Sequence, residues 1–228
     1  MNDYIHKEFP KTCAPDDFFG QVKRTVNGKP VSQEQIDIII ASIRNNLGLA
    51  KQDILLDVCA GNGALAKNIF PEIKAYLGVD FSEYLIEVAQ KNFEKLPDFK
   101  FRLSDALEYV KNEDSPSKFT KGLCYGAFQY LSYEAAEQFL KILGERFKNI
   151  QIFFIGNLPD KDRAHLFYPK DKDFSGLLND NSSPLGIWRT KAEMLELAEK
   201  TGWHIEIIDQ QKEFYSAHYR YDAKLTRK

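Results

Sequence analysis

The chain has 228 residues, of which 43% are hydrophobic, and its formal net charge at pH 7 is −2. This length and apolar content suit a single globular domain with its own core. The nearly balanced charge gives no general attraction to nucleic acid or to an anionic membrane. A polar start argues against a signal peptide, and no apolar run is long enough to span a bilayer. We therefore expect a cytoplasmic protein whose partners include neither nucleic acid nor a membrane.

The first fifty residues indicate a helical extension ahead of the main domain. Residues 32–35, Ser-Gln-Glu-Gln, have the form of a capping box. Apolar residues then recur at helical spacing, namely Ile36, Ile39, Ile40, Ile43 and Leu47. Gly48 is suited to end this helix. We expect residues 1–50 to form an N-terminal helical extension, within which residues 18–25 could fold as a lid over a ligand.

The most informative stretch is residues 54–63, Ile-Leu-Leu-Asp-Val-Cys-Ala-Gly-Asn-Gly. A continuous apolar run of this kind is typical of a strand buried on both faces of a parallel sheet. The run ends in Asp57, and Gly61 and Gly63 follow in a turn where the backbone can approach a ligand closely. We expect a helix to begin near Ala64 and to direct its N-terminal amides at the same place.

The next strand indicates a ligand that contains adenosine. Residues 75–79 form a second strand-like run that stops at Asp80, whose carboxylate could accept hydrogen bonds from ribose hydroxyls. The glycine pattern of residues 61–66 also fits NAD or FAD. Asp57 separates these alternatives, because a carboxylate at the turn repels a pyrophosphate but attracts a ligand with an ammonium group. S-adenosylmethionine (SAM) carries a sulfonium, an ammonium and a ribose, so it suits both acids.

Residues 53–130 resemble the core of the class I, Rossmann-like SAM-dependent methyltransferases. Residues 55–63 resemble the first motif of that family, although Cys59 stands where the family usually has its first glycine. The later motifs are matched by residues 79–82 (second-strand acid), 104–106 (third-strand motif) and 122–130 (fourth strand and its loop). The resemblance implies a methyltransferase that uses SAM and releases S-adenosylhomocysteine (SAH).

The resemblance also implies which residues hold SAM. Asp57 is expected to face the methionine ammonium, and Asp80 to bind the ribose hydroxyls. The set implied for cofactor binding is Asp57, Ala60, Gly61, Gly63, Asp80, Phe81, Asp105, Ala106, Tyr125 and Gly126. Two of these roles have alternatives. Phe81 contacts adenine or belongs to the core, and Asp105 accepts from the adenine amino group or only caps its helix.

Strand and helix signals alternate from residue 53 onward, which favours a parallel sheet wound with helices. Ser82, Ser132 and Thr190 each have the character of a residue that begins a helix. Residues 215–225 alternate apolar with polar types, which predicts a long, half-exposed antiparallel strand. Class I methyltransferases also insert their last strand antiparallel into the sheet.

We therefore expect an α/β fold with a doubly wound, mostly parallel seven-stranded sheet. Helices should cover both of its faces, and the last strand should be antiparallel. No repeat or linker demands a second domain, so residues 51–228 are expected to form one methyltransferase domain. The oligomeric state is not predicted.

The acceptor site is expected in residues 156–189, a long connection after the fifth strand that indicates a substrate-cap insertion. The candidate catalytic residues are Asp160 and His165, and the candidate acceptor-binding residues are Tyr130, Arg163 and Trp188. Arg163 either pairs with a carboxylate or phosphate of the acceptor or belongs to a solvated charged loop. His165 is either a general base or a surface histidine.

The expected acceptor is a small molecule, anionic if Arg163 binds it, and methylated at an oxygen or nitrogen atom. The four histidines are scattered, so no metal site is expected. Three isolated cysteines favour reduced thiols. Two other functions remain open. The chain could be a SAM-binding partner subunit that has lost catalysis, or an NAD-dependent oxidoreductase.

Overall fold

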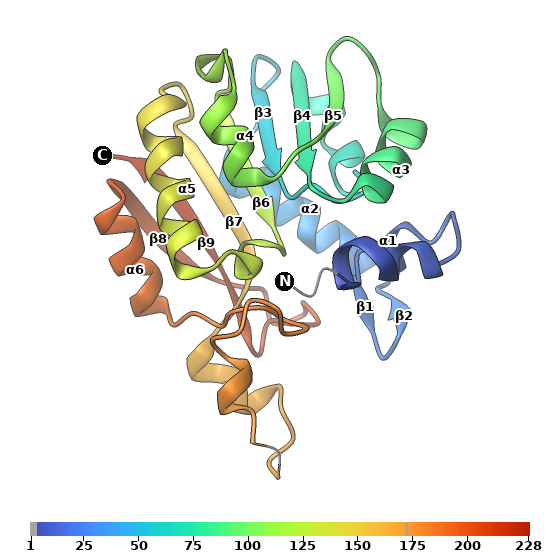
Figure 1. Cartoon of the computed structure of the whole chain (residues 1–228), viewed down its shortest axis with the longest axis vertical. Coiled ribbons are helices and arrows are strands. Elements are labelled where there is room, and N and C mark those ends of the chain that lie inside the picture. The colour runs from blue at the N-terminus through green and yellow to red at the C-terminus, as the bar shows by residue number, and fades with distance from the viewer. Residues whose placement is uncertain (1–3, 172) are drawn as a thin grey trace.

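The computed structural model describes residues 4–171 and 173–228 and is built around one large sheet (Figure 1). Its strands are β3 (Ile54–Val58), β4 (Ala75–Asp80), β5 (Phe99–Leu103), β6 (Lys121–Tyr125), β7 (Ile152–Pro159), β8 (Trp203–Asp209) and β9 (Arg220–Arg227). They are arranged in the order β5-β4-β3-β6-β7-β9-β8. Neighbouring strands from β5 to β7 are parallel, whereas β9 is antiparallel to both β7 and β8. The predicted fold class, with its seven strands and antiparallel last strand, is confirmed.

Helices cover both faces of this sheet. The α-helices are α1 (Phe18–Gln21), α2 (Gln33–Leu47), α3 (Glu83–Phe93), α4 (Ala106–Asn112), α5 (Tyr133–Arg146) and α6 (Lys191–Lys200). Successive residues of a strand point to opposite faces. Leu55 of β3 therefore belongs to the core cluster that contains residues of α2 and α3, whereas Leu56 belongs to the cluster that contains residues of α4, α5 and α6. Figure 1 shows α4, α5 and α6 in front of the sheet.

Most helix ends lie where the sequence indicates. The Ser132 hydroxyl accepts from the amide three residues later at the start of α5, and Thr190, expected to begin a helix, forms a capping box with Glu193 at the start of α6. Gly48 ends α2 in the left-handed conformation, with φ of 57°. Ser32 is the N-cap residue of α2, but its side chain makes no capping hydrogen bond. The predicted start of α2 is therefore right, while the predicted capping box does not form.

Residues 64–74, all of which the structure describes, form no α-helix, so the helix expected near Ala64 is a wrong prediction. Two short 3-10 turns, Ala66–Asn68 and Phe70–Glu72, lead directly into β4 instead. Pro71 lacks an amide hydrogen and cannot occupy a helix interior without breaking it. The few residues between Gly63 and this proline are too short for a stable helix.

The last strand is shorter and more buried than predicted. It begins at Arg220, and residues 214–219 form turns rather than strand. Because β9 lies between β7 and β8, helices cover both of its faces, and even its polar residues Arg220 and Asp222 are buried. The Asp222 carboxylate accepts from Ser42 at 3.1 Å and from Gln210 at 2.8 Å. Within β9, the polar residues Arg220 and Asp222 therefore form buried hydrogen bonds and do not face solvent.

Two segments outside the sheet matter for function. The first holds a π-helix (Tyr4–Glu8), a 3-10 helix (Phe9–Thr12), α1 and a hairpin of β1 (Thr25–Val26) and β2 (Lys29–Pro30). The second connects β7 to α6, contains 3-10 helices Lys161–Leu166 and Ser175–Leu177, and extends away from the sheet in Figure 1. Among the described residues, no helix has the length and apolar character needed to cross a membrane.

Candidate functional site

Two adjoining cavities open at the edge where the parallel strands end. The first, about 800 Å³, is bounded by the turn after β3, the end of β6 and residues 21–24. The second, about 820 Å³, is bounded by the ends of β4 and β5 and by residues 181–183. They share the lining residues Ile5, His6, Cys59, Ala127 and Tyr130. Ligands of open α/β sheets bind at this edge, beyond the carboxyl ends of the parallel strands.

The turn after β3 is tight because its backbone is repeatedly left-handed. Cys59, Gly61 and Gly63 have φ values of 59°, 60° and 76°. A Cβ atom at Gly63 would lie 2.5 Å from the ring of Phe101, so only glycine fits there. Cys59 adopts a conformation that favours glycine, which agrees with the glycine that the resembled family has at this position. The turn thereby keeps its backbone open toward the first cavity.

Asp80 ends β4 and faces the second cavity. One carboxylate oxygen accepts from the amide of Gly61 at 2.9 Å, and the other accepts from the amide of Ser82 at 2.9 Å. Burial raises the pKa of Asp80 above its usual range, and these backbone hydrogen bonds act in the opposite direction. The carboxylate is therefore fixed between the glycine turn and the start of α3, with lone pairs left for a ligand.

Asp57 lies on β3 beside the first cavity and is 5% exposed. Its carboxylate accepts a hydrogen bond of 2.8 Å from the Tyr76 hydroxyl. The pKa of Asp57 is raised to about 7, chiefly by burial and also by the charge of Asp80, against the lowering effects of the Tyr76 hydrogen bond and the Arg24 charge. A cationic ligand would strongly stabilise the ionised form of such a carboxylate, because it replaces the hydration that burial has removed.

All but one of the other residues in the predicted cofactor set border the same cavities. Phe81, Asp105 and Ala106 line the second cavity, and Ala60, Gly61, Tyr125 and Gly126 line the first. Asp105 is the N-cap of α4 and accepts from the amide of Leu107 at 2.8 Å. Its capping role is therefore present, whether or not it also contacts a ligand. Gly63 supports the turn from behind rather than lining either cavity.

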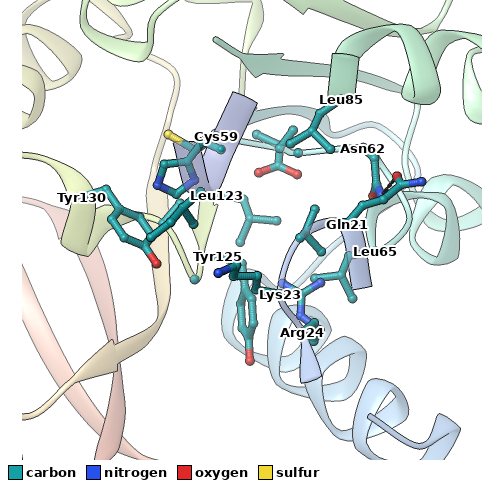
Figure 2. A pocket seen from close by; sticks show the side chains of 18 residues that line it. Gln21, Lys23, Arg24, Cys59, Asn62, Leu65, Leu85, Leu123, Tyr125 and Tyr130 are labelled. Carbon is teal, nitrogen blue, oxygen red and sulfur yellow. Dashed lines mark hydrogen bonds between the residues drawn. The ribbon is translucent and has the colours of Figure 1, made fainter. Parts of the chain in front are cut away.

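The N-terminal extension supplies one wall of the first cavity. Figure 2 shows Gln21 and Asn62 on the side of the cavity opposite Tyr130. Asn62 donates to the Phe18 carbonyl at 2.7 Å and to the Gln21 side chain at 2.9 Å. Arg24 lies over the ring of Tyr125 at 5.6 Å. The extension is thus fastened to the glycine turn, and it brings a guanidinium to the cavity that Asp57 lines.

The first turns of the chain cover the junction of the two cavities. His6 lines both, and its ring lies 4.4 Å from the Tyr130 ring and 5.8 Å from the Phe81 ring. The Ser82 hydroxyl donates to the His6 carbonyl at 2.7 Å. Sequence reasoning did not single out His6, because no local motif surrounds it. Its place depends on contacts across 76 residues of chain.

Only some residues of the connection between β7 and α6 lie at the cavities. Residues 181–183 line the second cavity, and Tyr130, predicted for the acceptor, lines both and donates to the Pro184 carbonyl at 2.9 Å. The predicted Asp160, Arg163, His165 and Trp188 line neither.

Each of those four side chains has a structural setting that explains its place. Asp160 caps the 3-10 helix that follows it, and Arg163 pairs with Asp160 at 3.4 Å and with Asp209 at 3.2 Å. His165 is exposed on that helix, and Trp188 is fully buried in a small aromatic core. Arg163 thus belongs to a charged surface network, the alternative that the sequence left open.

The main acidic groups of the site are two buried carboxylates, Asp57 at the first cavity and Asp80 at the second. Within residues 4–171 and 173–228, no group of three or more His, Cys, Asp or Glu side chains is placed to hold a metal ion. The polar groups that line the cavities include Asp57, Asp80 and Arg24, together with the backbone of the glycine turn.

The sequence profile of a methyltransferase-domain family matches residues 55–149, which span β3 to α5 and include both acids and the glycine turn. Residues 55–149 therefore belong to a SAM-dependent methyltransferase domain. The prediction made from the resemblance is confirmed at that level. Among curated proteins, none matches the chain.

Solved structures similar to this methyltransferase agree on the fold. Magnesium protoporphyrin IX methyltransferase from Synechocystis PCC 6803, crystallised with SAH, has a TM-score of 0.61 and 16% identity over 86% of this chain and 83% of its own. Geranyl diphosphate C-methyltransferase from Streptomyces coelicolor A3(2), in complex with Mg²⁺, geranyl diphosphate and SAH, has a TM-score of 0.61 and 12% identity over 87% and 84%. A chain of the Haloferax volcanii complex between the Trm112 methyltransferase activator and a putative methyltransferase reaches 0.66 and 13% over 96% and 97%. At these identities the likeness concerns the fold alone.

Proposed function

We propose that this methyltransferase transfers the methyl group of SAM to an oxygen or nitrogen atom of a small-molecule acceptor. The main support is the pair of buried carboxylates at the ends of neighbouring strands, Asp57 at the first cavity and Asp80 at the second. SAM is a ligand with an ammonium for one acid and ribose hydroxyls for the other. Small-molecule substrates are also what the magnesium protoporphyrin and geranyl diphosphate enzymes are named for.

The proposed cofactor position follows the shape of the two cavities. The methionine end occupies the first, with its ammonium at Asp57 and its carboxylate near Arg24. The adenosine end occupies the second, with the ribose hydroxyls at Asp80 and the adenine between Phe81 and Ala106. The free lone pairs of Asp80 and the raised pKa of Asp57 suit these partners. Bound SAM supplies a methyl carbon that is already activated by its sulfonium.

We also propose that residues 1–50 act as a lid and residues 156–189 as a substrate cap on the domain of residues 51–228. Residues from both segments border the cavities, which supports this division. Tyr130 forms part of the acceptor wall. An anionic acceptor finds support in Lys23, which lines the first cavity, rather than in Arg163, whose charge is matched by two aspartates.

Calorimetry of the purified protein with SAM, SAH and NAD tests the proposal. We expect both sulfur ligands to bind and NAD to bind more weakly than either. Asp80→Ala should weaken SAM binding by about 1–3 kcal/mol, because ribose hydroxyls then lose their buried acceptor. Asp98→Ala, at an exposed aspartate away from the cavities, serves as the control and should leave the affinity unchanged. Tighter binding of NAD than of SAM would contradict the proposal.

A further inference from the structure

The junction of the two cavities is the point where methyl transfer must take place if SAM binds as proposed. In SAM the sulfonium connects the ribose to the methionine chain. With the ribose at Asp80 and the ammonium at Asp57, the sulfur and its methyl group lie between the cavities. The residues that line both cavities therefore surround the methyl group, and they include Cys59, Tyr130 and His6.

Two of these three groups are poor proton acceptors near neutral pH. A hydrogen bond with Cys124, together with burial, raises the pKa of the Cys59 thiol well above its usual value, so it stays protonated. Burial also raises the pKa of Tyr130, and its hydroxyl already donates to the Pro184 carbonyl at 2.9 Å. Imidazole has an ordinary pKa of about 6.5 and accepts a proton readily at this pH. His6 is thus the shared lining residue suited to act as a base.

His6 is held at this point by packing from two sides. Its ring meets the Tyr130 ring edge-on, with centroids 4.4 Å apart and an angle of 75° between the planes. On the other side lies the Phe81 ring, at 5.8 Å. The Ser82 hydroxyl, buried at the start of α3, donates to the His6 carbonyl. A side chain fixed in this way has the restricted geometry that proton transfer requires.

We infer that His6 faces the transferring methyl group and is the general base of the reaction. The inference rests on the proposed function. A lone pair of the acceptor oxygen or nitrogen forms a bond to the methyl carbon while the carbon–sulfur bond breaks, with its electron pair passing to sulfur. The proton of the acceptor passes to the imidazole, so that SAM becomes SAH and His6 becomes an imidazolium. His6 then takes the role that the sequence suggested for His165.

The charge near His6 changes during each turnover, because the positive sulfonium of SAM becomes the neutral sulfur of SAH. Other titratable side chains also line the cavities. In the first they are Lys23, Arg24, Asp57, Cys59, Tyr125 and Tyr130, and in the second Asp80 and Asp105. Lys7 lies nearby, over the Phe81 ring at 5.1 Å. These are the same before and after transfer, whereas the sulfonium charge exists only in SAM. A positive charge beside an imidazole lowers its pKa. His6 should therefore be neutral when SAM is bound and more basic once SAH has formed.

Histidine NMR of the full-length protein can measure this difference. The chain has four histidines, so ¹³C-labelled imidazole signals can be assigned with single His→Gln variants and titrated in saturating SAM and in saturating SAH. We expect the pKa of His6 to lie below 7 in the SAM complex and to be higher by about 1 to 2 pH units in the SAH complex, as for a unit charge within about 6 Å at an effective dielectric constant of about 20. His165, His204 and His218 are exposed and outside both cavities, and they should titrate alike in the two complexes.

Each other outcome overturns the inference at a defined step. Equal pKa values of His6 in the two complexes mean that it does not face the sulfonium. A pKa above about 7.5 with SAM bound means that it is already an imidazolium at neutral pH and cannot take a proton. Both results leave the proposed function intact, since SAM and SAH are bound. Failure of calorimetry to detect either ligand overturns the proposed function itself, and the assignment of His6 with it.

Discussion

At the scale of single residues, Asp57 is a buried carboxyl group whose raised pKa favours the binding of a cation. Burial raises the pKa of its carboxyl group from 3.8 to about 7. In the unfolded chain the group is ionised above about pH 4, whereas the ligand-free fold retains the proton up to about pH 7. The unfolded state therefore binds fewer protons in this range, and Asp57 makes the ligand-free protein less stable as pH rises from about 4 to 7. A bound ammonium offsets this cost by favouring the charged form.

The same carboxyl group predicts how SAH binding depends on pH. Below pH 7 the ligand must bind to a form that has first lost a proton, so we expect the affinity to fall by about tenfold per pH unit as pH decreases from 7 to 5. Above pH 7 the affinity should level off. Calorimetry at a series of pH values measures this. Asp57→Asn is the control, since it should bind SAH more weakly and without the rise toward pH 7. An equal slope in wild type and variant would assign the titration to another group.

At the scale of an element, the glycine turn depends on contacts behind it as much as on its own flexibility. A Cβ atom at Gly63 would lie 2.5 Å from Phe101 Cζ, and the φ of 76° is left-handed. We expect Gly63→Ala to lower the free energy of unfolding by about 1–3 kcal/mol, measured by urea titration. Gly176→Ala is the matched control, because nothing lies within 4 Å of its added carbon and its φ is ordinary. Equal stability of the two variants would show that Phe101 can move aside.

The link between the N-terminal extension and the turn rests largely on Asn62. Its side-chain amide donates to the Phe18 carbonyl and to the Gln21 side chain, which are the first and last residues of α1. Asn62→Ala leaves these acceptors without their donor, which costs about 1–3 kcal/mol. We expect faster amide hydrogen exchange in residues 14–25 of the variant. Asn92→Ala, which removes an exposed amide that donates to a helix carbonyl, should leave exchange there unchanged. Unchanged exchange in both would mean that other contacts hold the extension.

At the scale of the whole molecule, the site is assembled from parts far apart in the chain. Its walls come from residues 5–6 and 21–24, from the ends of β3 to β6 and from residues 181–183. We expect SAH to slow amide exchange in residues 4–12 and 181–183 as well as in the glycine turn, because bound ligand holds these walls together. Exchange in α6, which contacts neither cavity, is the internal control. Protection confined to the strand ends would contradict the proposed roles of lid and cap.

The edge of the sheet shows a second whole-molecule property. β5 is an edge strand, and such strands can pair with other chains. At Phe101 the outward amide donates to the Glu94 carboxylate at 3.2 Å, and the outward carbonyl accepts from Gln90 at 3.1 Å. Side chains of α3 and the residue after it thereby occupy backbone groups that another strand would otherwise use.

The sequence by itself determined the fold and the domain family, because both depend on short-range patterns. The apolar run before Asp57, its glycines and the acid at Asp80 are each local signals, and alternating strands and helices specify a parallel sheet. Caps such as Thr190 act within one turn of helix, so they too could be read directly. The helix expected near Ala64 does not form, because Pro71 is a competing local signal that ends any helix within a few residues of the glycine turn.

Only the tertiary structure decided which polar side chains meet at the cavities. Nothing local distinguishes His6 from His165, yet the fold brings the first to the junction of the cavities and leaves the second on the surface. The charge of Arg163 was evident in the sequence, but its pairing with Asp209 on β8 was not. Burial of the polar row in β9 likewise depends on two neighbouring strands and the helices that cover them. Residue type determines which bonds and proton transfers a side chain can make. Long-range packing determines which other groups lie close enough to take part in them.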